Sequence, residues 1–276
     1  MGIIKVLDVS FKGEGAQAPI LTRVDKIESK GSLLLLDMSK VSDLPANNGK
    51  FTNLFADRAR QITGEESSID YNFSLNSSKG KIERTAKGGL HFIANPSITE
   101  SYDSYAVIKE TAAVRKFIKN NRMNLPTDHM FFFSAWVRYT TTGNAQRYTS
   151  NYSHDSNHNL QRIFYIGQSY STGTGNKRMS AKSGYGYNPD GTVSLPIDST
   201  NFNMFNGGAV GLNKVGSASR QYESVIFYRF YAEDLTLSGR TFEDVDALDN
   251  VLFNEAFAVG GKFYGDTYSD PNTVFA

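Results

Sequence analysis

Short segments of apolar or alternating residues, separated by turn residues, recur along the first third of the chain. Alternation at period two is typical of strands that bury one face. This pattern predicts strands at residues 3–9, 20–27, 33–38, 69–75 and 89–93. Residues 161–167 and 222–231 have the same pattern of apolar and alternating residues and are also expected to be strands.

The most apolar segment, residues 130–139, carries apolar side chains on both faces of a predicted strand. One face carries Phe131, Phe133, Ala135, Val137 and Tyr139, and the other carries Phe132, Ser134, Trp136 and Arg138. A strand that is apolar on both faces is expected at the centre of a sheet, with a layer on each side. In residues 222–231, the same alternation places Ile226, Tyr228 and Phe230 on one face and Val225, Phe227, Arg229 and Tyr231 on the other.

Two segments have the spacing of helices. Residues 111–121 have Ala112, Val114 or Arg115, and Ile118 near helical spacing. In residues 241–258, Thr241 and Asp244 have the spacing of a capping box. Val245, Leu248, Leu252 and Phe257 form an apolar stripe there, and Gly260-Gly261 ends the helix.

A polar, glycine-rich region covers residues 169–216. Its turn signals, such as Asn188-Pro189-Asp190-Gly191, predict hairpin tips rather than a linker. The region still supplies core candidates, namely Val193, Leu195, Ile197, Phe202 and Val210. Since no internal repeat and no flexible linker is present, a single domain is expected.

Composition narrows the class of protein. The 276 residues include no cysteine, which excludes a disulfide scaffold, a thiolate zinc site and a cysteine nucleophile. The net charge is +1, so no overall field attracts nucleic acid. Residues 1–8 predict a strand without the features of a secretory signal, and the longest apolar run, residues 33–36, is too short to span a bilayer. We therefore expect synthesis in a cytoplasm, with no membrane insertion and no nucleic-acid partner.

We do not expect the acidic residues of the second predicted helix to form a catalytic pair. Glycosidases hold two carboxylates at a defined separation, whereas Glu243, Asp244, Asp246 and Asp249 are expected on a solvated helix face. No phosphate-binding loop, nucleophile elbow or Ser/His/Asp arrangement is found. We predict no catalytic residue and no cofactor.

We do not expect the histidines to form a metal site. His154 and His158 have the spacing of a helical metal pair, but the Asp-Ser-Asn between them favours a polar loop. Asp155, Asn157 and Asn159 alternate as in a calcium loop, but the glycine and terminal glutamate of that motif are absent. We predict no metal, with loop calcium as the alternative.

Tyrosines mark the candidate contact sites. Those expected on loops are Tyr148, Tyr152, Tyr170, Tyr185 and Tyr187. Tyrosine is enriched at protein interfaces, and its ring also stacks on sugars. Contact with a protein neighbour, contact with a glycan, and half-burial in a strand are the three interpretations.

Charge is unevenly distributed along the chain. Residues 79–122 hold nine basic and four acidic side chains, whereas residues 233–270 hold nine acidic and two basic ones. This asymmetry indicates complementarity within the molecule, a solvated surface, or docking between subunits.

Two segments resemble a known family. Residues 131–138 (FFFSAWVR) resemble the central strand of laminin-G-like, concanavalin A-like jelly rolls, and residues 224–235 resemble their closing strand. Residues 31–38, 51–54 and 88–92 are similar to the opening of jelly-roll proteins in tailed-phage virions. The calcium and sugar residues of lectin relatives have no match here. The resemblance covers roughly residues 33–257.

The resemblance implies an all-β, concanavalin A-like jelly roll with a short C-terminal helix. It also implies a non-enzymatic structural component of a phage virion (tail, baseplate or neck) that is made in the bacterial cytoplasm. Its partners would be other virion structural proteins and further copies of itself. The alternatives are a receptor-binding module for host-surface glycans and a polysaccharide hydrolase.

The ends of the chain are the expected docking segments. We expect N-terminal strands or a docking segment at residues 1–30, the jelly roll at 31–258 and a C-terminal extension at 259–276. An extended segment can add a strand to a neighbour's sheet, although residues 1–30 could instead form edge strands of the same sandwich. Terminal docking predicts that deleting residues 2–18 leaves a folded chain that no longer assembles.

Overall fold

The chain folds mostly into antiparallel β-sheets. The structure, a computed structural model, describes residues 25–41, 49–72, 80–95, 106–110, 112–122, 129–142, 149–153, 162–167, 173–183, 201–207 and 223–275. Sheet A contains β1 (Ser32–Asp37), β4 (Gly80–Arg84), β5 (Leu90–Ala94), β7 (Phe131–Tyr139), β10 (Gly175–Lys182) and β12 (Val225–Asp234). Sheet B contains β2 (Gly49–Phe51), β3 (Ile69–Asn72), β6 (Ala106–Glu110), β8 (Ser150–Ser153), β9 (Arg162–Ile166) and β11 (Asn201–Gly207).

The strand order places β7 and β12 at the middle of sheet A. The order is β10-β7-β12-β5-β4, and β1 pairs with the second half of β12 while β5 pairs with its first half. Sheet B has the order β2-β3-β6-β11-β8-β9. The prediction of a central strand at residues 130–139 is therefore confirmed.

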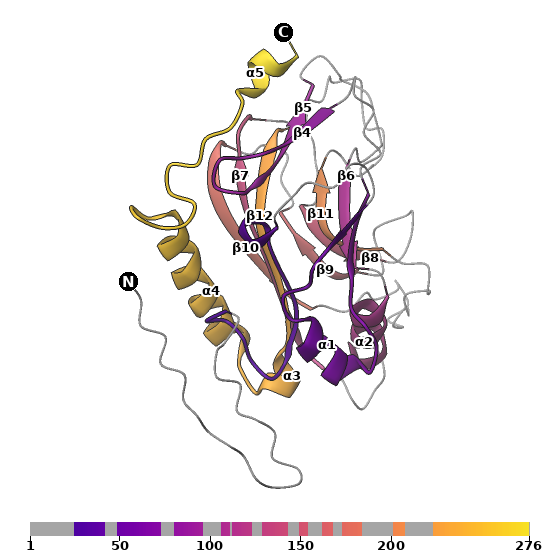
Figure 1. Ribbon diagram of the computed structural model, residues 1–276. Coiled ribbons are helices and arrows are strands. Elements are labelled where there is room, and N and C mark those ends of the chain that lie inside the picture. The colour runs from indigo at the N-terminus through magenta and orange to yellow at the C-terminus, as the bar shows by residue number, and fades with distance from the viewer. Residues whose placement is uncertain are drawn as a thin grey trace, which may run out of the picture.

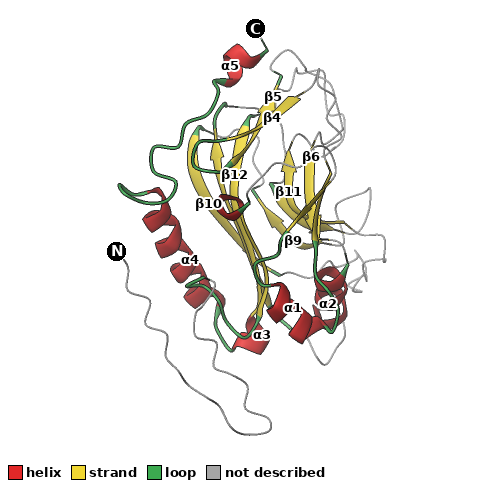
Figure 2. Ribbon diagram, in the orientation of Figure 1, coloured by secondary structure: helices red, strands yellow, loops and turns green. Residues whose placement is uncertain are grey.

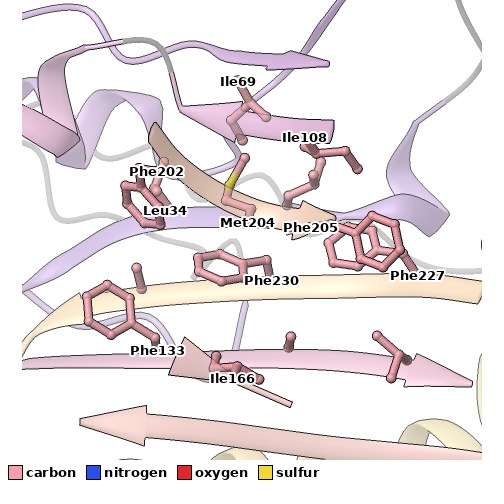
Figure 3. Packing of buried hydrophobic residues seen from close by; sticks show 14 of the residues in the cluster. Leu34, Ile69, Ile108, Phe133, Ile166, Phe202, Met204, Phe205, Phe227 and Phe230 are labelled. Carbon is pink, nitrogen blue, oxygen red and sulfur yellow. The ribbon is translucent and has the colours of Figure 1, made fainter. Parts of the chain in front are cut away.

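The main core lies between the two sheets (Figure 3). Phe133 of sheet A stacks on Phe164 of sheet B, with ring centroids 3.9 Å apart. Phe205 of sheet B contacts Phe92 and Phe227 of sheet A at 4.5 and 4.9 Å. Because aromatic side chains from both sheets interdigitate, the sheets pack face to face over one apolar layer.

A second apolar layer covers the opposite face of sheet A, which we call the outer face. Helix α4 (Phe242–Phe257) lies along this face, on the side away from sheet B (Figure 1). Phe132 and Trp136 point into this layer, whereas Phe131, Phe133, Ala135, Val137 and Tyr139 point into the main core. The two faces of β7 are thus divided as the alternation predicted.

Strand β12 does not alternate as expected along its whole length. Val225 and Phe227 face the main core and Ile226 and Tyr228 face outward, as predicted. The register with β7 then shifts between Phe227 and Arg229. This β-bulge moves Phe230 into the main core, so its predicted placement beside Ile226 is wrong. A bulge inserts one extra residue and reverses the alternation that follows it.

Both predicted helices are present. Helix α2 (Ala113–Arg122) covers the first, and α4 begins with the expected capping box between Thr241 and Asp244. The helices α1 (Ala56–Thr63), α3 (Leu235–Ser238) and α5 (Pro271–Val274) and the 3-10 turn η1 (Met38–Lys40) complete the described elements. Figure 2 shows α1 and α2 together at one end of the sandwich. In the part of the chain that the structure describes, no helix is long and apolar enough to cross a membrane.

Several strands differ from the sequence predictions. Residues 33–38 and 89–93 overlap β1 and β5, and residues 69–75 and 161–167 include β3 and β9. Residues 25–27 form a turn instead of ending a strand, and residues 1–24 lie outside the described residues. Strands β2, β4, β6, β8, β10 and β11 were not predicted, although Phe202 of β11 is buried as expected.

Candidate functional site on the outer face of sheet A

Trp136 is the centre of a buried polar cluster between β7 and α4. Its indole nitrogen lies 3.1 Å from each carboxylate oxygen of Asp249, whose side chain is fully buried on α4. Burial raises the pKa of Asp249, although Arg229 and the indole N–H oppose that shift. A buried carboxylate without such partners would be strongly destabilising, so these contacts offset the free-energy cost of burying Asp249.

Arg178 of β10 ties the edge of sheet A to α4. Its guanidinium lies 2.7 Å from Asp246 and 3.4 Å from Asp249, and the Ser180 hydroxyl donates to Asp246 at 2.5 Å. Burial alone would raise the pKa of Asp246, but the bonds from Arg178 and Ser180 outweigh it and lower the pKa. The expectation of a solvated acidic face holds for Glu243 and Asp244 and is wrong for Asp246 and Asp249, because the helix turns these two toward the sheet.

Arg229 of β12 binds the segment at residues 25–29. It donates two hydrogen bonds to the Asp25 carboxylate, at 2.9 and 3.1 Å, and its guanidinium lies 4.5 Å from the centre of the Trp136 ring. Bidentate Arg–carboxylate pairs are strong and geometrically specific. Asp25 therefore has a fixed place on the outer face.

Lys262, just after α4, pairs with Asp37 at the end of β1. Burial alone would raise the pKa of Asp37, but the Lys262 ammonium outweighs it and lowers the pKa. The groups around Trp136 form one charge network, which consists of Asp25, Asp37, Arg178, Arg229, Asp246, Asp249 and Lys262. This network connects six separate parts of the chain, namely residues 25–29, β1, β10, β12, α4 and the start of the segment after α4.

A second group of contacts holds residues 27–29 near the end of β12. Glu233 is buried and accepts hydrogen bonds from Tyr231, Arg240 and Ser29. Arg240 also donates to the backbone carbonyl of Ile27 at 2.8 Å. Ile27 itself is fully buried in the outer apolar layer. Residues 25–29, which belong to no strand, are thus held by side chains of sheet A and its flanks.

The C-terminal residues cross the same outer face. We call residues 262–275 the tail, and we call Glu83, Thr85, Lys87, His91, Arg138 and Tyr228 the tail-binding surface. Asp266 of the tail accepts hydrogen bonds from the Thr85 hydroxyl at 2.6 Å, the Lys87 backbone N–H at 2.7 Å and the Tyr228 hydroxyl at 2.9 Å. The C-terminal extension expected from the sequence therefore lies against its own sheet.

His91 lies fully buried beneath the tail. Its Nδ1 lies 2.9 Å from Glu83 and its Nε2 lies 2.9 Å from the Thr140 hydroxyl. A neutral ring that donates from Nδ1 and accepts at Nε2 satisfies both partners. Glu83 also accepts two hydrogen bonds from Ser269 of the tail. Burial lowers the pKa of His91, and Glu83 opposes that shift only in part.

One further histidine–carboxylate pair lies at the other end of sheet A. The Nδ1 of His129 lies 2.6 Å from Asp234, which also caps α3 through the backbone N–H of Leu237. Burial raises the pKa of Asp234, against the effect of these bonds. In the described part of the chain, no hydroxyl is hydrogen-bonded to the other ring nitrogen of His129. The pair therefore joins the segment before β7 to the end of β12, where α3 begins, and it lacks a nucleophile among the described residues.

Neither a protein-family model nor a curated protein matches the chain.

The predicted contact tyrosines do not lie in this site. Tyr148, Tyr170, Tyr185 and Tyr187 lie outside the described residues, and Tyr152 is described only as a backbone position in β8. His154 and His158 also lie outside them. Among the residues that are described, no group of three or more His, Asp or Glu side chains is placed to hold a metal ion.

The acidic C-terminal part of the chain is mostly used inside the molecule. Glu233, Asp234, Asp246, Asp249 and Asp266 all contact donors of the same chain. The ion-pair partners of Glu233, Asp246 and Asp249 are Arg240 and Arg178, which lie outside the basic segment at residues 79–122. No local sequence pattern identified the charge network, since Asp25 and Arg229 are 204 positions apart.

Proposed function

We propose that this chain is a non-enzymatic structural component of a tailed-phage particle that acts by docking onto other particle subunits. The observation that supports this most is the outer face of sheet A, which holds residues 25–29 and the tail through side-chain contacts. Neither segment belongs to a sheet. Binding an irregular segment through buried aromatic and charged anchors is the chemistry that subunit docking uses.

The finer fold that we propose is a concanavalin A-like jelly roll. Its support is the pair of facing antiparallel sheets, together with the pairing of the Trp136 strand β7 with the late strand β12. Residues 131–138 and 224–235 resemble the central and the closing strand of that family. The resemblance of residues 31–38, 51–54 and 88–92 to the opening of jelly-roll proteins in tailed-phage virions favours a virion location, with synthesis in the bacterial cytoplasm.

Particle composition tests this function directly. Purified particles of the phage that encodes this chain should contain it in a fixed ratio to the major structural proteins, measured by quantitative mass spectrometry. Tail and baseplate genes should flank its gene. A chain found in the lysate of infected cells but absent from particles would overturn the proposal.

Two other outcomes would contradict it. Reproducible glycan-array binding that is lost on Tyr148→Ala or Tyr185→Ala would favour a receptor-binding module. Release of reducing sugar from the host envelope would favour a hydrolase.

A further inference from the structure

The tail contacts sheet A in the way that a bound peptide contacts a receptor. The side chains of Phe263, Asp266 and Pro271 are buried, whereas most residues between them are exposed. Buried anchors separated by exposed residues are typical of segments that bind through side-chain specificity.

The anchor sites are chemically distinct. The Asp266 carboxylate accepts hydrogen bonds from three donors. These are the hydroxyl of Thr85 just after β4, the backbone N–H of Lys87 and the phenol of Tyr228. The Phe263 ring packs against Tyr228, with centroids 4.4 Å apart, and the Tyr268 ring contacts His91 and lies under the Arg138 guanidinium. The surface therefore selects an aromatic residue, then an aspartate three positions later, then a second aromatic residue.

The tail is joined to the strands of sheet A by few backbone contacts. Among the described residues, the single hydrogen bond between two backbone groups that joins the tail to the β4–β5 turn runs from Ala86 N to Thr267 O, at 3.0 Å. No ladder of sheet bonds has to break when the tail leaves. Segments held in this way open at lower free energy than the core strands.

The conformation of the short linker between α4 and the tail sets the direction in which the tail leaves α4. Residues 258–261 connect α4 to the tail, and Val259 is 83% exposed. Gly260 has a φ of 82°, a left-handed conformation that turns the chain back onto its own sheet. A straightened linker would carry the tail away and leave the tail-binding surface unchanged.

Exposed apolar side chains mark the same region independently. The large apolar side chains that are exposed in the described part of the chain are Val251, Val259 and Tyr264. They lie on α4, on the linker and in the first residues of the tail. Val259 and Tyr264 belong to the linker and the tail, so both side chains are accessible to a second copy.

We propose that, in the assembled state, the tail of one copy binds the tail-binding surface of a second copy. This inference rests on the proposed docking function and names its partner, a second copy, and its segment, residues 262–275. In the exchange, Phe263, Asp266 and Tyr268 make their anchor contacts with the second copy, and the backbone bonds of the turn, such as Gly261 N to Ala258 O, are broken. Exchange of one segment between identical copies is a low-cost route to association. The high local concentration of copies in a particle favours binding between chains.

The absence of cysteine allows a direct test. Ala86 and Thr267 are both exposed and joined by a backbone hydrogen bond, so cysteines at these two positions lie within reach of each other. Chains with Ala86→Cys and differently tagged chains with Thr267→Cys are co-expressed, assembled and oxidised. Tail exchange predicts a disulfide between the two chains, in several-fold higher yield than for a control mixture of Lys50→Cys and Thr267→Cys. Lys50 is an exposed residue of sheet B.

A second variant ties the disulfide to the anchor. Adding Asp266→Asn to the Thr267→Cys chain should lower the yield between chains several-fold, since an amide cannot accept from all three donors. Adding Asp270→Asn should leave the yield unchanged, because Asn also caps α5. A yield that does not respond to Asp266→Asn would overturn the proposal.

The controls separate this inference from the proposed function. Sedimentation velocity shows whether the chains associate. If they associate, but a disulfide forms only within single chains of the double variant Ala86→Cys/Thr267→Cys, then tail exchange is wrong and docking still stands. If the chain is absent from particles, the proposed function is wrong, whatever the disulfide pattern.

Discussion

The indole nitrogen of Trp136 lies 3.1 Å from both carboxylate oxygens of Asp249, so one buried contact joins the central strand β7 to helix α4. Arg178 reaches the same carboxylate from β10. Three elements that are far apart in sequence therefore meet at a single side chain. The position of α4 over sheet A depends on that side chain as much as on apolar packing.

We expect Asp249→Ala to lower the free energy of unfolding by about 3–5 kcal/mol, the cost of breaking a buried charged cluster by removing one partner. The variant leaves the buried Trp136 N–H without its acceptor and leaves Asp246 as the carboxylate that pairs with Arg178. Urea denaturation followed by Trp136 fluorescence measures the change. Glu243→Ala, on the exposed side of the same helix, should change it by no more than about 0.5 kcal/mol. Equal effects of the two variants would contradict the assigned role of Asp249.

Arg229→Lys should destabilise the protein although it keeps the charge. A lysine cannot donate to both oxygens of Asp25, nor can it stack flat on Trp136. The expected loss is about 1–3 kcal/mol, the range for hydrogen bonds to charged groups. The matched control is Arg60→Lys, because Arg60 forms only exposed ion pairs with Asp57 and Glu66 and should change stability by less than about 1 kcal/mol. The prediction fails if both variants unfold at the same urea concentration as the parent.

Periodicity and local capping predicted the parts of the fold that depend on neighbouring residues. The two faces of β7 followed from alternation alone, and the Thr241–Asp244 box placed the start of α4. Strand β10 was missed because its sequence, GNKRMSAK, has few apolar residues. It becomes a strand by pairing with β7 along its whole length, which is a tertiary effect that overrides propensity.

The candidate site was beyond sequence reasoning for a different reason. The bulge at residues 227–229 of β12 turns Arg229 and Tyr231 outward together, and no local sequence pattern predicts this bulge. The partners of these side chains come from residues 25–32, about 200 positions away. The sequence around Asp266 and Ser269 is typical of a polar tail, because the burial of Asp266 and the hydrogen bonds of both residues exist only once sheet A has formed.

Stability should fall as the solution is acidified, and His91 should account for the first part of the fall. Burial lowers the pKa of His91 below its ordinary value of 6.5. The unfolded chain therefore takes up this proton more readily than the folded protein does. The stability linked to His91 is fully present above about pH 6.5 and is lost as the pH falls below that value toward the lower pKa of the folded state.

Urea midpoints between pH 8 and pH 5 measure this dependence. His91→Gln, which keeps hydrogen-bonding groups but does not titrate, should flatten the profile in that range. Glu83 has a lowered pKa as well, but its contribution is lost only in more acidic solution, below its ordinary value of 4.5. A variant with the same slope as the parent between pH 7 and pH 5 would show that His91 does not control this step.

Gly261→Ala should loosen the tail while leaving the sandwich folded. A Cβ at this position would lie 2.2 Å from the carbonyl oxygen of Glu255 and 2.6 Å from that of Ala256, both in the last turn of α4. The close approach lets the Phe263 N–H cap the Ala256 carbonyl at 2.8 Å. Because these are backbone atoms, they cannot move aside cheaply, so the chain must leave the turn and Phe263 must leave Tyr228.

Hydrogen exchange of residues 262–275 measures this loosening. We expect faster exchange in the tail and a loss of about 1–3 kcal/mol in global stability, as for overpacked positions, with protection in β7 and β12 retained. Gly173→Ala is the matched control, because nothing lies within 4 Å of a Cβ there. If the tail of the Gly261 variant exchanges at the parent rate, the turn at residues 258–261 does not hold the tail, and the linker cannot decide between binding within one chain and binding between two.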